Sequence, residues 1–237
     1  MRVVDVKYAR FFETVADDFL VGYLRDPMIS PIVTAGLDTL AVRIPDHPRT
    51  LDLLRVFGGP VAAPAANPAG QISPTPAAHV AESFAGGISA VLDTGPTTIG
   101  LESTILDVTR GPVLLRHGGI PKETLESFLG HPIEEATTGE AIRAPGQLQS
   151  HYAPNARVQL NQTLPSPRAV LIGFGEIKGD LTLSAKGDLV EAAAQLFALL
   201  RKADTMGKAA IHIAPIPNDG IGRAINDRLT RAAAPKA

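Results

Sequence analysis

The sequence predicts an α/β protein in two parts: a region of strands and helices in irregular order, followed by a small domain with a parallel sheet. Short apolar segments bounded by glycine and proline alternate with amphipathic segments over most of the chain. After residue 156 strand-like and helix-like segments alternate regularly, which is typical of a parallel sheet. The 237 residues are enough for one large or two modest domains, and the hydrophobic fraction of 45% is ordinary for a globular protein.

Between residues 28 and 136 strands and helices are expected in irregular order. Residues 37–44 alternate apolar and polar side chains and are therefore expected to form a strand. Amphipathic segments that end near glycine predict helices, and short apolar segments between turns predict strands. The expected helices are 50–57, 75–84 and 122–129, and the further strands are 61–66, 88–92, 103–108 and 113–116.

The two ends of the chain have patterns of their own. Residues 1–27 carry a weak amphipathic helix pattern, formed by Phe11, Phe12, Val15 and Phe19. Residues 137–156 are rich in glycine and proline and are expected to be a linker. Beyond it, the expected strands are 169–174 and 209–214, and the expected helices are 189–201 and 221–232.

Composition excludes several classes of function. The chain has no cysteine, which excludes disulfides, thiolate zinc sites and cysteine nucleophiles and suits a reducing compartment. The net charge of −2 gives no overall attraction to nucleic acid or membranes, although a local basic patch stays possible. No apolar run approaches the ~18 residues of a membrane helix, and Asp17 and Asp18 interrupt the one candidate signal peptide. We therefore expect a cytoplasmic protein without membrane contact.

Residues 60–76 are the strongest pointer to a ligand. They are too rich in proline and glycine for a helix and too apolar for a disordered linker. Small side chains let a ligand approach the backbone, and the Asn67-Pro68 turn exposes N–H groups and a side-chain amide. This suits a nucleotide or a small polar substrate. The histidines have no metal-ligand spacing, so no metal site built by the protein is expected (His79, His117, His131 and His151).

Four blocks of sequence resemble one family by their order and spacing. They are TAGLDTLAVRIP at 34–45, the run at 60–75, GLESTILD at 100–107 with LRHGGI at 115–120, and APG at 144–146 with HYAP at 151–154. Together they resemble the threonylcarbamoyl-AMP synthases of the YrdC-like superfamily, in the two-domain form. The resemblance implies an incomplete YrdC-like catalytic domain with a twisted mixed sheet over 28–136, a linker over the active site at 137–156 and a Rossmann-like domain over 157–237. Residues 1–27 are unmatched.

The resemblance also implies a reaction. The family forms threonylcarbamoyl-adenylate and pyrophosphate from L-threonine, bicarbonate and ATP, for the threonylcarbamoyladenosine modification of tRNA. ATP would be a substrate that arrives with Mg²⁺, and no tightly bound cofactor is implied. A downstream tRNA threonylcarbamoyl transferase complex would consume the product, and any contact of this chain with tRNA would be weak.

The family's site residues map onto nine positions. The resemblance implies ATP contacts from Thr39, Ala65, Asn67, Ser73, Arg116 and Tyr152, and threonine contacts from Arg43, Ala63 and Ser103. The catalytic side chains stay unknown; the resemblance implies that the protein's task is mainly to align the substrates and stabilise the leaving pyrophosphate.

Plainer interpretations of these residues stay open. Arg43 and Arg116 could be exposed strand residues, Asn67 a turn residue, Ser73 a helix N-cap and Tyr152 a packing anchor. A nucleophilic Ser103 is not expected, because no Gly-x-Ser-x-Gly turn surrounds it. Ala65 stands where the family has a serine, which removes a hydrogen bond of ~0.5–1.5 kcal/mol.

The start of the sequence also departs from the family. The family normally has roughly ninety more residues before this region, within the usual domain size. Those residues carry a threonine that binds the substrate and a Lys-x-Arg pair for the ATP phosphates, and no such pair precedes Thr34 here. We therefore expect little synthase activity from this chain alone. The alternatives are a non-catalytic remnant that binds nucleotide or threonine weakly, and an RNA-binding relative on the same fold.

Overall fold

The structure is a computed structural model that describes residues 19–24, 30–34, 36–136 and 150–235. These residues form two compact units, and neither unit is one continuous stretch of chain. The first unit takes its described residues from 1–63 and 102–147, and the second from 64–101 and 148–237. The domain limits expected from the sequence, 28–136, 137–156 and 157–237, stay a prediction.

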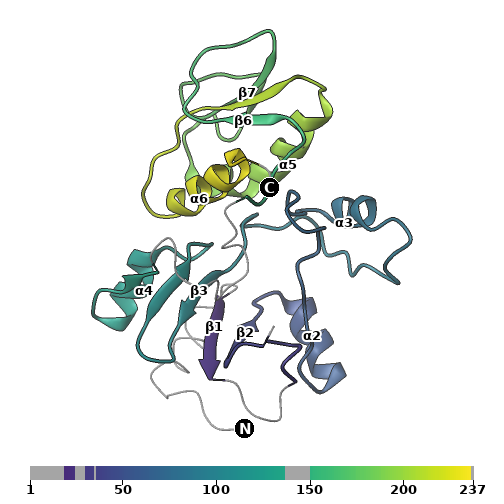
Figure 1. The fold of residues 1–237 in the computed structure, drawn as a ribbon, viewed down its shortest axis with the longest axis vertical. Helices are drawn as coiled ribbons and strands as arrows, with labels where there is room; N and C mark the ends of the chain where they lie inside the picture. The colour runs from purple at the N-terminus through teal and green to yellow at the C-terminus, as the bar shows by residue number, and fades with distance from the viewer. Residues whose placement is uncertain (1–18, 25–29, 35, 137–149, 236–237) are drawn as a thin grey trace. The chain divides into compact units, whose positions relative to one another are not determined.

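A mixed five-stranded sheet forms the frame of the first unit in its described part (Figure 1). The central pairings are antiparallel between β1 and β2, parallel between β1 and β3, and antiparallel between β3 and β4. The strands in order across the sheet are β2 (Thr39–Ile44), β1 (Phe19–Leu24), β3 (Thr104–Asp107), β4 (Val113–Arg116) and β5 (Glu134–Glu135). The mixed α/β class predicted from the sequence is confirmed.

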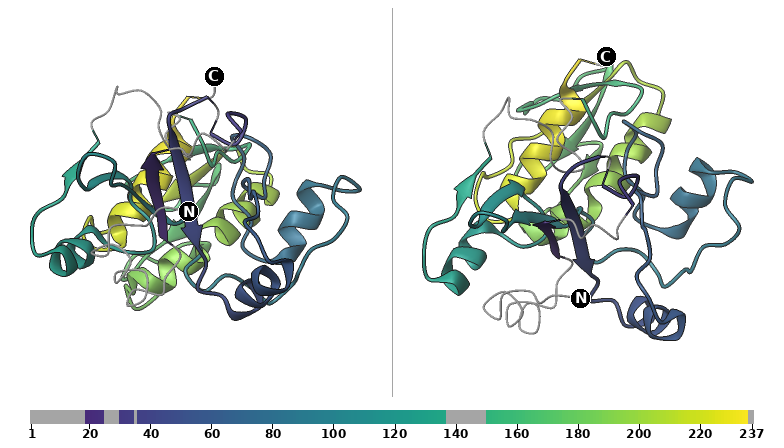
Figure 2. Two further views of the ribbon diagram at one scale, coloured as in Figure 1. Left: turned by 90° about the horizontal axis from the view of Figure 1, so that it is seen from below. Right: turned by 60° about the horizontal axis from the view of Figure 1, so that its bottom comes forward.

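The first strand corrects one expectation. Phe19 begins β1, so the amphipathic helix expected through this residue is wrong there, while Phe11, Phe12 and Val15 lie outside the described residues. The sequence FLVGYL is rich in aromatic and branched residues that suit a pleated strand. Pairing on both sides, with β2 and with β3, outweighs a weak helical pattern. Figure 2 shows β1 and β2 side by side from two further directions.

The core of the first unit lies between β3, β4 and α4 (Lys122–Leu129). The helix directs its buried Leu125 and Leu129 at the strands, and it ends as predicted at Gly130, whose φ of +74° suits glycine. The buried members of this core are Leu106, Leu114, Ile120, Leu125, Leu129 and Ile133.

Helix α2 (Pro48–Phe57) has a different environment. It starts two residues before the predicted position, with proline in its first turn, and ends at Gly58 with a φ of +73°. None of its residues is buried, and Val56 and Phe57 are 89% and 63% exposed. This helix therefore gains its stability from local interactions more than from packing.

Two predicted strands are wrong. Residues 61–66 and 88–92 have irregular backbone, and their side chains are exposed. Both segments contain residues that favour strands, but a strand also needs a neighbour for its N–H and C=O groups. Neither segment is paired within the described sheets.

The second unit contains a parallel sheet, as the sequence predicts. Helices α5 (Leu189–Thr205) and α6 (Gly222–Ala233) lie side by side and pack on it (Figures 1 and 2). The strands in order are β6 (Arg157–Gln159), β9 (Ala210–Ile213), β7 (Ala169–Gly173) and β8 (Leu181–Thr182), all parallel. The short strands β6 and β8, like β5, were not predicted.

The segment 64–101 contributes to the core of this second unit. Ile72 and Leu101 are buried in the same cluster as the apolar faces of α5 and α6. Gly100 lies so close to α5 that a Cβ atom there would be 2.6 Å from the Ala193 carbonyl oxygen. The short helix α3 (Ala77–Ser83), in contrast, buries none of its residues. In the described part of the chain, no helix is long and apolar enough to cross a membrane.

Candidate functional site

Arg116 and Ser103 lie together in the first unit. The Arg116 guanidinium donates to the Ser103 carbonyl oxygen from Nε at 3.0 Å and from Nη2 at 2.8 Å. The register shifts beside this pair: Ile105 lies opposite Arg116, whereas Leu106 lies opposite Leu114. A bulge of this kind redirects the neighbouring side chain. The two sequence-predicted residues are therefore joined, and the arginine is held by backbone instead of extending into solvent.

Thr104 fastens the following loop to this strand. It is fully buried, and its Oγ1 donates to the Ile120 carbonyl oxygen at 2.7 Å and accepts from the Ile120 N–H at 3.0 Å. Gly118, within the same loop, approaches so closely that a Cβ atom there would be 2.2 Å from the Thr104 nitrogen. The hydroxyl and the missing side chain together fix the loop next to Ser103.

The other predicted residues of the first unit lie on or after β2. Thr39 and Arg43 are four residues apart on this strand and therefore share a face. Thr39 is half-buried, whereas Arg43 and Ala63 are exposed. Ala63 lies in the irregular segment that follows α2, and not on the strand that the sequence predicts.

Three of the four predicted ATP contacts in the second unit, Ala65, Asn67 and Ser73, lie in or next to one tight loop. The Asn67 side-chain amide donates to the carbonyl oxygens of Pro68 at 3.2 Å and Gln71 at 3.0 Å, so it closes the turn itself. Asn67 and Ser73 are each only 8% exposed, whereas Ala65 is exposed. Helix α3 starts at Ala77 and has Pro76 as its N-cap. Ser73 therefore does not cap that helix, so the plainer interpretation of this residue as an N-cap is wrong, and its ATP contact stays a prediction.

Tyr152 is a core residue in this structure. Its side chain is 1% exposed, its ring centroid is 5.4 Å from that of Phe197, and the Arg228 guanidinium lies 5.5 Å from the ring centroid. Its φ of +60° is unusual for an aromatic residue. The next residue, Ala153, donates its N–H to the Gly70 carbonyl oxygen at 3.0 Å, so the Tyr152 segment is bound to the Asn67–Ser73 loop. The structure displays the packing role that the sequence left open, and an ATP contact stays a prediction.

Two basic side chains adjoin the same loop. Arg201, on α5, donates from Nη2 to the Ile72 carbonyl oxygen, and His79 Nδ1 accepts from the Thr75 N–H at 3.3 Å. Burial and then the positive charge of Arg201 lower the pKa of His79, while Glu82 opposes the shift. A cleft of about 710 Å³ opens here, lined by residues 69–72, His79 and Arg201 among others.

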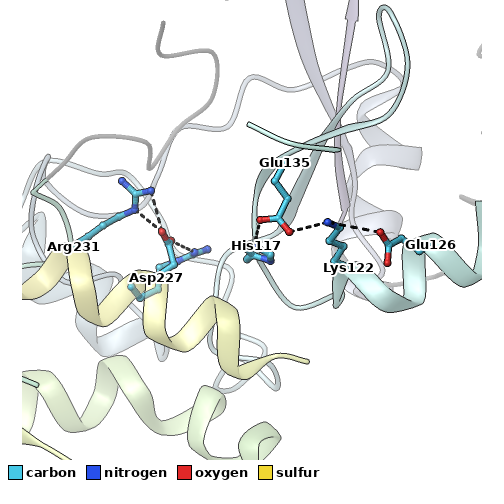
Figure 3. Close-up of polar contacts among 7 residues, drawn as sticks. His117, Lys122, Glu126, Glu135, Asp227 and Arg231 are labelled. Atoms are coloured by element: carbon cyan, nitrogen blue, oxygen red, sulfur yellow. Dashed lines mark hydrogen bonds and ion pairs between the residues drawn. The ribbon is translucent and has the colours of Figure 1, made fainter. Parts of the chain in front are cut away.

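Each unit contains ion pairs between neighbouring charged side chains (Figure 3). In the first unit, Glu135 accepts from Lys122 Nζ at 2.9 Å and lies 3.3 Å from His117 Nε2. The hydrogen bond from Lys122 is the main reason that the pKa of Glu135 is lowered. In the second unit, Asp227 binds Arg231 at 3.0 Å on α6. The described residues contain no group of three or more His, Cys, Asp or Glu side chains that could hold a metal ion.

The sequence did not indicate Thr104 or Arg201. Thr104 lies in the sequence block at 100–107, but the resemblance implies a substrate contact only for its neighbour Ser103. Arg201 lies within an ordinary amphipathic helix, and its partners are 128 and 129 positions away along the chain. No local pattern marks such a contact.

The fold of this chain is similar to that of proteins with solved structures. It matches the crystal structure of Pyrococcus abyssi Sua5 complexed with L-threonine with a TM-score of 0.86 and 32% identity, over 98% of this chain and 75% of that one. A structure of the same protein with a neighbouring histidine and tyrosine both replaced by alanine matches with a TM-score of 0.84 and 31% identity, over 98% and 74% of the two chains. The class is thus an α/β protein of the Sua5 fold.

Family models and curated relatives agree with this class. A model described as threonylcarbamoyl-AMP synthase, C-terminal domain, matches residues 120–234. A second model, named for Sua5, YciO and YrdC and described as telomere recombination, matches residues 7–118 and so extends into the segment 1–27 that we expected to be unmatched. The threonylcarbamoyl-AMP synthase of P. abyssi is 35% identical over 230 residues, 88% of this chain and 68% of that protein. That of Bacillus subtilis is 40% identical over 229 residues, 86% and 66% respectively.

The chain belongs to the threonylcarbamoyl-AMP synthase family. It spans about two thirds of the length of the two curated relatives just described.

Proposed function

We propose that this chain acts in threonylcarbamoyl-AMP synthesis: it binds L-threonine, bicarbonate and ATP, and forms threonylcarbamoyl-adenylate with release of pyrophosphate. The observation that carries the proposal is the likeness, over 98% of this chain, to a Sua5 structure that holds L-threonine. The 35–40% identity to curated synthases supports the same reaction. Because fold alone does not fix activity, the identity of the binding residues is the second part of the proposal.

The proposed reaction needs alignment and charge stabilisation more than acid–base chemistry. The threonine amine and bicarbonate form a carbamate with loss of water. A carbamate oxygen then attacks the α-phosphorus of ATP, the bond to the β-phosphate oxygen breaks, and pyrophosphate leaves. Positive charge near the phosphates stabilises that step. Arg116 suits this role, because its guanidinium is already oriented by the Ser103 carbonyl oxygen.

The proposed binding residues are those of the sequence analysis. Arg43, Ala63 and Ser103 would contact threonine. Thr39, Ala65, Asn67, Ser73, Arg116 and Tyr152 would contact ATP. Magnesium would enter as part of the ATP substrate. A tRNA threonylcarbamoyl transferase complex would take the product in the cytoplasm, where ATP and tRNA meet, and weak contact of this chain with tRNA is part of the proposal.

The proposal is tested by calorimetric titration of the chain with L-threonine and with ATP, beside an assay of pyrophosphate release that depends on threonine and bicarbonate. We expect Arg43→Ala to weaken threonine binding at least tenfold and Arg116→Ala to weaken ATP binding at least tenfold, because each removes a charge-assisted contact. The control is Arg110→Ala, an exposed arginine on the turn between β3 and β4, which should change neither affinity.

Turnover separates the proposal from its alternatives. Residues 1–33 contain no Lys-x-Arg pair, so we expect slow pyrophosphate release from this 237-residue polypeptide even where both substrates bind. Binding of neither ligand by the unaltered chain would contradict the proposed function. Binding without any turnover would favour the non-catalytic alternative, and a tRNA complex that dissociates with added salt would favour the RNA-binding one.

A further inference from the structure

Arg201 reaches from helix α5 to the backbone just before α3. Its Nη2 donates to the carbonyl oxygen of Ile72, and its Nε lies 3.5 Å from the carbonyl oxygen of Ser73. The side chain is half-buried, and burial lowers its pKa while Glu82 opposes that shift. The guanidinium still carries its charge, because arginine titrates far above neutral pH. A planar fork of N–H donors fits two successive carbonyl groups in a way that an ammonium group does not.

The backbone held by Arg201 is the end of the loop 67–73. Other hydrogen bonds also fix this loop: the Asn67 amide bonds to Gln71, and the Ala153 N–H bonds to Gly70. The side chain of Ile72 is buried in the core beside α5. Arg201 adds an attachment at the end of the loop that carries Ser73.

Other charged or titratable side chains of the described residues line the cleft beside this attachment. His79 and Glu82 lie on α3, and Lys202 and Asp204 lie on α5. The positive charge of Arg201 lowers the pKa of His79, and Asp204 is engaged by the backbone N–H groups of Asn155 and Ala156. Arg201 thus bonds the loop directly through its guanidinium.

We infer that Arg201 is a positioning residue for ATP: it holds the loop 67–73 in the conformation that presents Asn67 and Ser73 to the nucleotide. This inference rests on the proposed function, because it takes that loop as part of the ATP site. Arg201, on α5, would then support nucleotide binding through the loop, without itself contacting the nucleotide.

The test combines hydrogen exchange with calorimetry on the complete chain. We expect Arg201→Gln to raise amide exchange in residues 67–73 at least tenfold and to weaken ATP binding at least tenfold, with L-threonine affinity unchanged within twofold. Arg201→Lys should show only part of both effects, because it keeps the charge and a donor group but loses the planar fork. Arg168→Gln, the matched control, makes the same change at an exposed arginine in the turn before β7 and should leave exchange and both affinities as in the unaltered chain.

Three outcomes would overturn the inference. Unchanged exchange in residues 67–73 of Arg201→Gln would show that the loop does not depend on this side chain. Unchanged ATP affinity would show that the attachment does not serve the nucleotide. Equal losses of ATP and threonine affinity would indicate general destabilisation. Failure of the unaltered chain itself to bind ATP would contradict the proposed function first, and the exchange measurement would still report whether Arg201 holds the loop.

Discussion

Thr104 is a small side chain that carries two long-range hydrogen bonds. Thr104→Val keeps its shape but removes the hydroxyl, so the buried N–H and C=O groups of Ile120 lose their partner. Leaving buried backbone groups unpaired is costly, and we expect a loss of about 2–3 kcal/mol in the free energy of unfolding. Urea denaturation of the purified variant measures this loss.

The matched variant for this position is Thr104→Ser. It retains the hydroxyl and removes only a methyl group, so most of the stability should remain. If Thr104→Val were as stable as the unaltered chain, the two hydrogen bonds would add nothing to the free energy of unfolding. In that case the hydroxyl could not be what holds the loop beside Ser103.

The residues that the sequence predicted for the site share one property: each lies in a short block whose order along the chain is informative. Ser103 and Arg116 are examples, and the structure joins them by hydrogen bonds. Their roles with substrates stay predictions. Arg201 was missed because its contact depends on the folding of α5 against Ile72, and a pattern in neighbouring residues contains no record of that packing.

The carboxylate of Asp188 caps the N-terminus of helix α5. Asp188 Oδ1 accepts from the N–H of Val190 at 2.8 Å and of Glu191 at 3.1 Å, which satisfies two groups that have no partner inside the helix. We expect Asp188→Ala to cost about 1 kcal/mol of unfolding free energy, and Asp188→Asn only a few tenths, because asparagine is also a good N-cap. Thermal unfolding followed by circular dichroism compares the two. An Asp188→Ala protein as stable as the unaltered chain would mean that water replaces the cap without cost.

Elements with their own periodicity were predicted well, and elements that depend on partners were not. Helices α4 and α5 and strands β7 and β9 follow from amphipathic or apolar segments between turn residues. Strands β5 and β8 have two residues each, and only their neighbours in the sheet define them. Residues 61–66 and 88–92 show the reverse error, since strand-like composition without a paired neighbour gives no strand.

Each unit builds its core from separate parts of the chain. This predicts which unit a given core substitution will destabilise. Leu101 belongs to the core of the second unit, and Leu114 to that of the first. Leu101→Ala should destabilise the second unit by about 2–4 kcal/mol, although the residue lies outside the sequence segment that contains its sheet. The near-ultraviolet circular dichroism of Tyr152, which is buried in that core and free of overlap with tryptophan, should report the loss.

The control for this prediction is Leu114→Ala. Hydrogen exchange should then rise in β3 and β4, with little change in α5. If Leu101→Ala instead loosened β3 and β4 and left the Tyr152 signal intact, the assignment of residues 64–101 to the second unit would be contradicted.

The position of β1 between β2 and β3 determines when this sheet can be completed during synthesis. β1 and β2 leave the ribosome well before the other neighbour of β1, which begins only at Thr104. Two strands by themselves are marginally stable in water, and their free edge can pair with another chain. Closing the long loop to β3 has an entropic cost that slows such non-local pairing. The nascent chain therefore passes through a stage in which an unpaired strand edge is open, and chaperones that cover such edges should increase its yield.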